Sequence, residues 1–132
     1  MVAKREVIHS SARTSGSSRN EMTPVSSVVR GGDFLFLAGL VAVDLQSNEL
    51  MRGTTASETR LILANLKTLV EAAGSSLDKI VKINVVLHSM LEAPNMNEVY
   101  AGFFSDPPPA RTVCGAVLPD RMKVMIECTA LA

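Results

Sequence analysis

Hydrophobic and polar residues alternate over several short segments of the chain, a pattern typical of β-strands with one buried face. Gly31, Gly32 and Asp33 separate two such runs. Because glycine readily adopts the positive φ of tight turns, these residues predict a hairpin. The segment REVIHS alternates weakly and predicts a short edge strand. The expected strands span residues 5–10, about 25–30, about 34–43 and about 80–88.

The period changes between Thr55 and Ala73, where apolar residues recur at the spacing of a helix that packs one face on a sheet. Thr55, with Glu58 three residues later, predicts a capping box, and Gly74 stands where a C-terminal glycine is expected. A second helix is expected in EAPNMNEVYAGFF, with Pro94 in its first turn and DPPP after its end. The stripe of the first helix consists of Ile62, Leu63, Leu66, Leu69, Val70 and Ala73.

Two further alternating runs, ARTVCGAV and MKVMIECTALA, lie on either side of Leu118, Pro119 and Asp120 and predict an antiparallel hairpin. The order of elements is then β-β-β-α-β-α-β-β. We expect one domain over residues 1–132, of the α+β class: a two-layer sandwich with a mixed sheet and two helices on one face. The Ser-rich SARTSGSSRNEMTP predicts a loop, either a flexible connection or a flap over a pocket.

Several expected strands, such as LFLAGLVAV and VMIECTALA, are apolar at positions of both parities. A sheet built from them and covered on one face only would expose a large apolar patch. Such patches usually mark self-association, so a homo-oligomer is expected.

Composition narrows the choice of partners and location. The 132 residues are 47% hydrophobic, the 13 basic and 13 acidic residues cancel, and aromatic residues are few. Neither a phosphate-binding groove nor a base-stacking surface is predicted, so nucleic acid is not an expected partner. No run approaches the ~18 apolar residues of a membrane span, and no secretory signal precedes the domain. We expect a cytoplasmic protein in which Cys114 and Cys128, on predicted neighbouring strands, are small thiols and not a disulfide.

Arg111 and Glu127 each lie eight residues from Pro119. In an antiparallel hairpin they would be neighbours on one face. One interpretation is a cross-strand ion pair; the other is a site in which the guanidinium binds a substrate carboxylate and the carboxylate positions or deprotonates a water. His88 and His9 have no partner in the sequence pattern and are expected to be structural. No metal-binding, phosphate-loop or dinucleotide motif occurs, so no cofactor is expected.

The segments EAAGSSLDKIVKINVVL, NEVYAGFF, PPARTVCGAVLP and KVMIECTALA resemble, in order and spacing, the RidA/YjgF family of enamine/imine deaminases, and GDFLFLAG fits the family's early strand. The resemblance covers residues 24–132. It implies a chorismate-mutase-like α+β fold in a homotrimer, with three sheets around a central barrel and clefts at the subunit interfaces.

The resemblance also implies cofactor-free hydrolysis of enamines and imines of the 2-aminoacrylate type, giving a 2-keto acid and ammonia. Arg111 matches the arginine that holds the substrate carboxylate, and Glu127 matches the glutamate proposed to act on the attacking water. Asn97 and Tyr100 match recurring residues of the second helix. The expected catalytic residues are therefore Arg111 and Glu127.

Two departures from the family pattern point to an altered pocket. Val25 follows Pro24 where a tyrosine is usual, and Ala38-Gly39-Leu40 replaces a Ser-Gly-Gln triplet. The pocket should then be more apolar, favouring a larger substrate such as a 2-aminomuconate-like enamine. The alternatives are a pathway-specific hydrolase or cyclase and a non-catalytic ligand-binding trimer. The expected substrate-binding residues are Arg111, Val25, Ala38, Leu40, Val113, Cys114, Asn97 and Tyr100.

Overall fold

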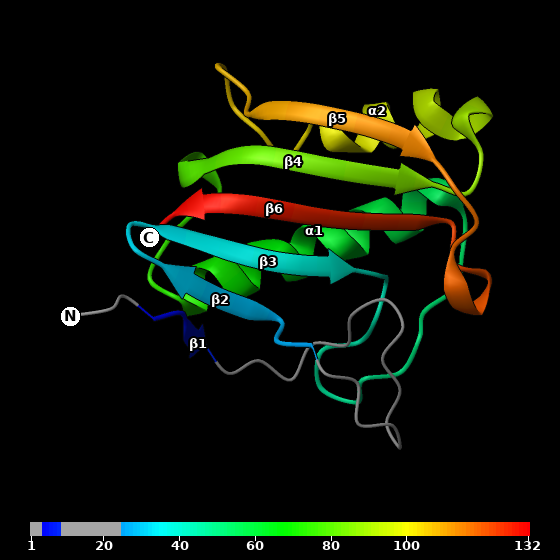
Figure 1. The fold of residues 1–132 in the computed structure, drawn as a ribbon. Coiled ribbons are helices and arrows are strands. Elements are labelled where there is room, and N and C mark those ends of the chain that lie inside the picture. Colours follow the sequence, from blue (N-terminus) through cyan, green and yellow to red (C-terminus); the bar gives the residue numbers. More distant parts are fainter. Residues whose placement is uncertain (1–3, 9–24) are drawn as a thin grey trace.

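Within the described part of the chain, a mixed sheet of six strands forms one layer of the protein (Figure 1). The computed structural model describes residues 4–8 and 25–132. The strands are β1 (Glu6–Ile8), β2 (Val28–Gly31), β3 (Phe34–Leu40), β4 (Ile80–Leu87), β5 (Ala110–Gly115) and β6 (Val124–Leu131). The predicted order of strands and helices is confirmed, and β1 is the expected edge strand. The Ser-rich loop and His9 lie outside the described residues.

The hairpin predicted around the double glycine is present between β2 and β3. Gly32 has a φ of 58°, a conformation that glycine adopts without steric cost. The first of these strands begins at Val28, later than expected, and the second ends at Leu40, earlier than expected.

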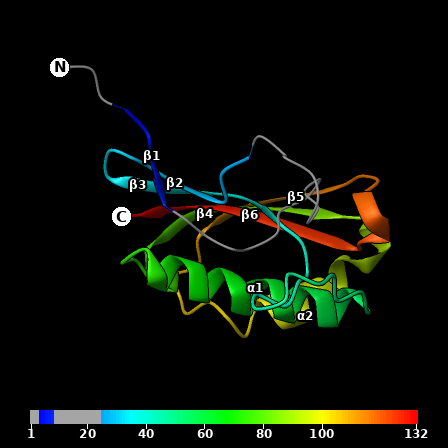
Figure 2. The ribbon, with the colours of Figure 1, turned by 90° about the horizontal axis from the view of Figure 1, so that it is seen from below.

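Two helices, α1 (Thr55–Ala72) and α2 (Ala93–Tyr100), lie on the same face of the sheet (Figure 2). The predicted apolar stripe of α1 is confirmed: it faces the sheet, and Ile62, Leu63, Leu66 and Val70 are fully buried. α2 is shorter than the predicted segment 92–104, because it ends at Tyr100 and residues 101–103 form a turn. The layers are therefore the predicted ones, with a shorter second helix.

The N-terminal cap of α1 differs from the prediction by one residue. The capping box is made by Thr54 and Ser57, because the Thr54 hydroxyl accepts from the Ser57 amide and the Ser57 hydroxyl accepts from the Thr54 amide. Glu58 instead points into the protein and is 1% exposed. Gly74 has a φ of 87° directly after the C-cap residue, as expected for a helix-ending glycine.

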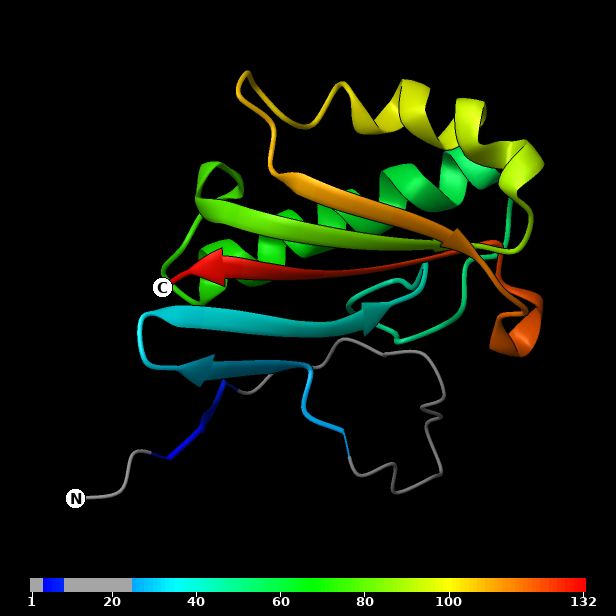
Figure 3. The same ribbon diagram turned by 45° about the horizontal axis from the view of Figure 1, so that its top comes forward.

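The strand order is β1-β2-β3-β6-β4-β5, so the predicted hairpin of the last two strands is wrong. β4 lies between β5 and β6, pairing parallel with β5 and antiparallel with β6 (Figure 3). The segment that joins β5 to β6 passes the end of β4. Cys114 and Cys128 are therefore not on neighbouring strands, and both are free thiols. Cys128 is buried, and burial is the main cause that raises the pKa of its thiol to about 12.

The pairing of β3 with β6 contains a bulge at Ala38 and Gly39. Leu37 pairs with Cys128 and Leu40 with Ile126, so three steps along β3 match two along β6. As a result Leu37 and Leu40 both face the helices.

No helix of the described residues lies on the second face of the sheet (Figure 2). Apolar side chains are exposed on this face. Phe34 and Phe36 are 40% and 47% exposed, and their rings lie 6.4 Å apart. Leu131 pairs with Phe34 and extends this patch onto β6. The exposed apolar face expected from the sequence pattern is thus present. In the described part of the chain, no helix is long and apolar enough to cross a membrane.

Candidate active site

Arg111 lies near the start of β5 at the edge of the sheet and is held by two side chains of α2. Its Nη1 donates to Asn97 Oδ1 at 2.7 Å, and its guanidinium carbon lies 4.7 Å from the centre of the Tyr100 ring. A cation over an aromatic face is attracted by the ring, and an amide oxygen fixes one edge of the planar fork. The sequence-predicted residues Arg111, Asn97 and Tyr100 are therefore brought together.

Tyr100 is nearly buried, and its phenolic oxygen has no hydrogen-bond partner within the described residues. Burial raises the pKa of this phenol, and the nearby charge of Arg111 opposes that shift. The ring thus acts on Arg111 as a neutral aromatic surface.

A cavity of about 490 Å³ opens beside Arg111. One wall is formed by α2 and the other by the proline-rich segment that leads into β5. This volume is within the range of roughly 300–1,000 Å³ found for small-molecule sites. The cavity is lined by Asn97, Tyr100, Ala101, Phe104, Ser105, Asp106, Pro108, Pro109 and Arg111.

Glu127 lies in the middle of β6 and faces away from the helices. Its partner across the ladder is Asn84, whose amide nitrogen donates to Glu127 Oε1 at 2.7 Å. A smaller hollow of about 180 Å³ surrounds this pair, with Phe36 at its rim. Asn84 was not singled out from the sequence, because its role depends on a strand pairing that the pattern does not reveal.

Within one chain, Arg111 and Glu127 are not neighbours. Arg111 pairs with Ile83, whose side chain is buried under the helices, whereas Glu127 pairs with Asn84 on the open face. Adjacent residues of a strand point to opposite faces, so the two charged side chains lie on opposite sides of the sheet. The prediction that they are neighbours on one face is therefore wrong, and so is the interpretation as a cross-strand ion pair.

The other predicted binding residues lie in different environments. Val25 is exposed ahead of β2, and Ala38 is half-buried at the bulge. Leu40 is 2% exposed in the core, so the prediction that it lines a pocket is wrong; the bulge turns its side chain inward. Val113 packs against the core beneath the sheet, and Cys114 is exposed on the open face.

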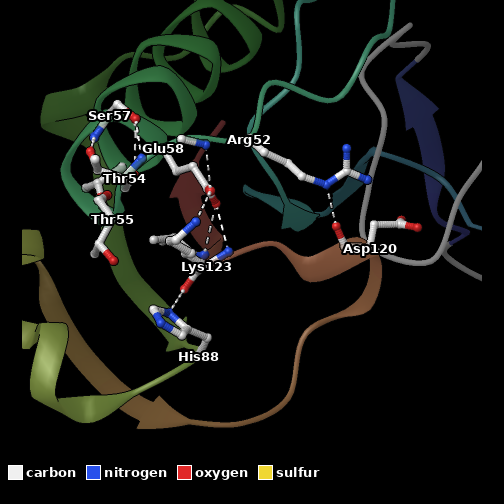
Figure 4. A network of polar contacts seen from close by, with 11 residues as sticks. Arg52, Thr54, Thr55, Ser57, Glu58, His88, Asp120 and Lys123 are labelled. Carbon is white, nitrogen blue, oxygen red and sulfur yellow. Dashed lines mark hydrogen bonds and ion pairs between the residues drawn. The ribbon is translucent and has the colours of Figure 1, made fainter.

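A buried polar network links the start of α1 to the start of β6 (Figure 4). Glu58 Oε1 accepts from the amides of Lys123 and Val124 at 2.8 and 3.3 Å, and Oε2 accepts from the amide of Gly53 at 3.1 Å. Lys123 Nζ lies 3.9 Å from Oε2. Each polar partner of this carboxylate among the described residues is thus a donor. The network was missed from sequence because its partners are up to 66 residues apart.

His88 contacts this network through Lys123. Its amide donates to the carbonyl oxygen of Lys123 at 2.9 Å, and its ring Nδ1 lies 3.4 Å from the same oxygen (Figure 4). The imidazole is exposed at the end of β4. Residues 4–8 and 25–132 contain no group of three His, Cys, Asp or Glu side chains arranged to hold a metal ion.

The model of the endoribonuclease L-PSP family matches residues 17–132. The chain belongs to this family. It is the RidA/YjgF family that the sequence resembles. This L-PSP family chain is 40% identical over 111 residues to a RutC family protein of Pyrococcus horikoshii, covering 83% of the chain and 86% of that protein. It is 33% identical over 105 residues to the 2-iminobutanoate/2-iminopropanoate deaminase of Dermatophagoides farinae, covering 79% of the chain and 82% of that deaminase.

Solved structures of the L-PSP family share the fold. RidA from the Antarctic bacterium Psychrobacter sp. superimposes with a TM-score of 0.79 at 28% identity, over 91% of this chain and 99% of that one. E. coli TdcF with bound serine gives a TM-score of 0.82 at 27% identity, over 96% of this chain and 98% of the TdcF chain. The expected RidA-like α+β fold is therefore confirmed.

Proposed function

We propose that the protein is a hydrolytic deaminase of enamines and imines that carry a carboxylate, releasing ammonia and a 2-keto acid. The observation that carries this proposal is Arg111, an exposed guanidinium whose orientation is fixed by Asn97 and Tyr100 at the mouth of a cavity. An oriented guanidinium binds a carboxylate through two parallel N–H donors. The relative named as an imine deaminase supports the choice of substrate class.

The proposed reaction adds water across the carbon–nitrogen double bond. An enamine first takes up a proton on carbon and releases one from nitrogen, which gives the imine. The water oxygen then bonds to the imine carbon, and both water protons end on the nitrogen as the carbon–nitrogen bond breaks and the carbonyl forms. The nitrogen leaves as ammonia. Glu127 is proposed to hold the water and take its proton, because its carboxylate has acceptor capacity beyond the bond from Asn84. No cofactor is required for these steps.

The proposed assembly is a homotrimer with its sites between subunits. Because Arg111 and Glu127 lie on opposite sides of one sheet, a shared site needs the β5 edge of one copy to approach the open face of another. The exposed Phe34 and Phe36 on that face supply apolar area for such a contact. Analytical ultracentrifugation at micromolar concentration should show trimers, and a stable monomer would contradict the assembly.

The decisive experiment for the function couples imine release from a pyridoxal-phosphate dehydratase to the detection of ammonia and keto acid. Wild-type protein should accelerate hydrolysis over the spontaneous rate, and Arg111→Ala should remove the acceleration for every substrate. If the wild type gives no acceleration, yet calorimetry shows Arg111-dependent binding of keto acids, the non-catalytic ligand-binding alternative replaces the deaminase.

Complementation tests whether the two charged residues come from different copies. Arg111→Ala and Glu127→Gln chains are co-expressed with different tags, and mixed oligomers are isolated. In a symmetric trimer that contains both kinds of chain, about one interface in three combines an intact Arg111 with an intact Glu127. Activity should therefore return in the mixed oligomers only. Inactive mixed oligomers would place both residues of a site in one chain. Activity of the oligomer made of Glu127→Gln chains alone would instead remove Glu127 from the reaction.

A further inference from the structure

The lining of the cavity beside Arg111 combines two charged residues with a group of apolar ones. The rings of Tyr100 and Phe104 lie 4.7 Å apart, and with Pro108 and Pro109 they provide a rigid apolar wall. Phe104 is half-buried, so part of its ring is available to a ligand. The volume of the cavity, about 490 Å³, is larger than a three-carbon imino acid, the smallest candidate substrate, would fill.

The second charged residue of the cavity is acidic. Asp106 lies on the loop before β5 and lines the same space as Arg111. A ligand whose carboxylate binds Arg111 and whose side chain fills the cavity would bring any second carboxylate toward Asp106. Two carboxylates in one cavity repel each other, and removing the second one from water adds to the free-energy cost of binding. The cavity is therefore suited to one carboxylate and an apolar body.

We infer that Phe104 is a specificity-determining residue and that the substrates are monocarboxylic 2-imino acids with an aromatic or branched apolar side chain, which lies in this cavity. The inference rests on the proposed deaminase function and adds to it a substrate class. It opposes dicarboxylic substrates of the 2-aminomuconate type. The sequence pattern attributes selectivity for apolar substrates to Val25, Ala38 and Leu40. The inference attributes it instead to the apolar wall of the cavity beside Arg111.

The test measures kcat/KM for imines made from alanine, leucine and phenylalanine by an L-amino-acid oxidase, and for the dicarboxylic imine made by an aspartate oxidase. Wild-type protein should prefer the phenylalanine and leucine imines over the alanine imine by roughly ten- to two-hundredfold, the range for apolar pocket contacts. Phe104→Ala should reduce that ratio at least tenfold. Asp106→Asn should raise the relative rate of the dicarboxylic imine.

Phe103→Ala is the matched control, because Phe103 precedes Phe104 but does not line the cavity. It should leave the ratio unchanged. The ratio also separates specificity from stability: if Phe104→Ala slows all imines equally, the ring acts only through Tyr100 and Arg111, and the inference is wrong. A preference for the alanine or dicarboxylic imine would overturn the substrate class while the deaminase function stands. No turnover of any imine would instead remove the proposed function.

Discussion

Replacing Glu58 by glutamine should destabilise the protein even though the two side chains have nearly the same shape. All neighbours of the carboxylate are donors: the amides of Gly53, Lys123 and Val124, and the Lys123 ammonium (Figure 4). An amide group has only one acceptor oxygen, so its NH₂ must face a donor in either orientation. The mismatch cannot be relieved by rotation of the side chain.

The magnitude follows from the contacts. In the better orientation the glutamine oxygen keeps the Lys123 and Val124 amides, while its NH₂ opposes the Gly53 amide. A buried donor left without an acceptor costs about 1–3 kcal/mol, and a hydrogen bond to a neutral group is worth about 1 kcal/mol less than one to a charged group. Summed over these contacts, the expected loss in the free energy of unfolding is about 2–4 kcal/mol.

Urea denaturation at one fixed protein concentration measures this loss, because stability depends on concentration in an oligomer. Glu71→Gln is the matched control: Glu71 is an exposed residue of the same helix, 4.0 Å from Lys67, and its loss should cost less than about 1 kcal/mol. Glu58→Ala should be at least as destabilised as Glu58→Gln. If Glu58→Gln unfolds at the wild-type urea concentration, the all-donor environment of Glu58 is incorrect.

Three further predictions concern groups at or near the candidate site. Arg111→Lys should fold normally but lose most deaminase activity, because an ammonium cannot reproduce the planar fork; equal losses of activity and stability would indicate a structural role. Tyr100→Phe should unfold no earlier than wild type, since the buried hydroxyl it removes lacks a partner among the described residues; clear destabilisation would reveal a missing partner. The raised pKa of Cys128, about 12, keeps the folded thiol protonated where the unfolded thiol ionises. The contribution of this thiol to the free energy of unfolding is complete below about pH 9 and should fall by about 1.4 kcal/mol per pH unit as pH rises toward 12. In urea titrations at several pH values, Cys128→Ala should lack this pH-dependent loss. An identical pH dependence in both proteins would contradict the assignment.

The sequence pattern predicted those features that depend on neighbours along the chain. The apolar stripe of α1 and the turn at Gly32 follow from periods and residue types within a few positions, and both are observed. The α1 cap was displaced by one residue because Thr54 and Thr55 are both suitable N-caps. Glu58 cannot complete a capping box with Thr55, because its carboxylate binds amides at the start of β6. A pattern of residues close in sequence does not predict that contact.

The strand order could not be predicted from the pattern of the last two strands. Two alternating runs around Pro119 fit a hairpin as well as they fit two strands with a third between them. Because β4 lies between β5 and β6, Arg111 and Glu127 are on opposite faces of the sheet. The resemblance therefore still supplies the proposed site residues, but the prediction that they are neighbours in one chain is wrong. Leu40 was misplaced for a similar reason, since the bulge in β3 changes the face of every residue after it.

The central position of β6 bears on how the protein can form during translation. β6 pairs with β3 on one side and β4 on the other, yet it follows both of them in the chain. Until residues 124–131 have left the ribosome, β1–β3 and β4–β5 are two separate halves with no strand to join them. During translation these apolar strands can therefore associate with wrong partners before β6 is available. A premature stop before β6 would leave the edges of β3 and β4 unpaired and open to aggregation.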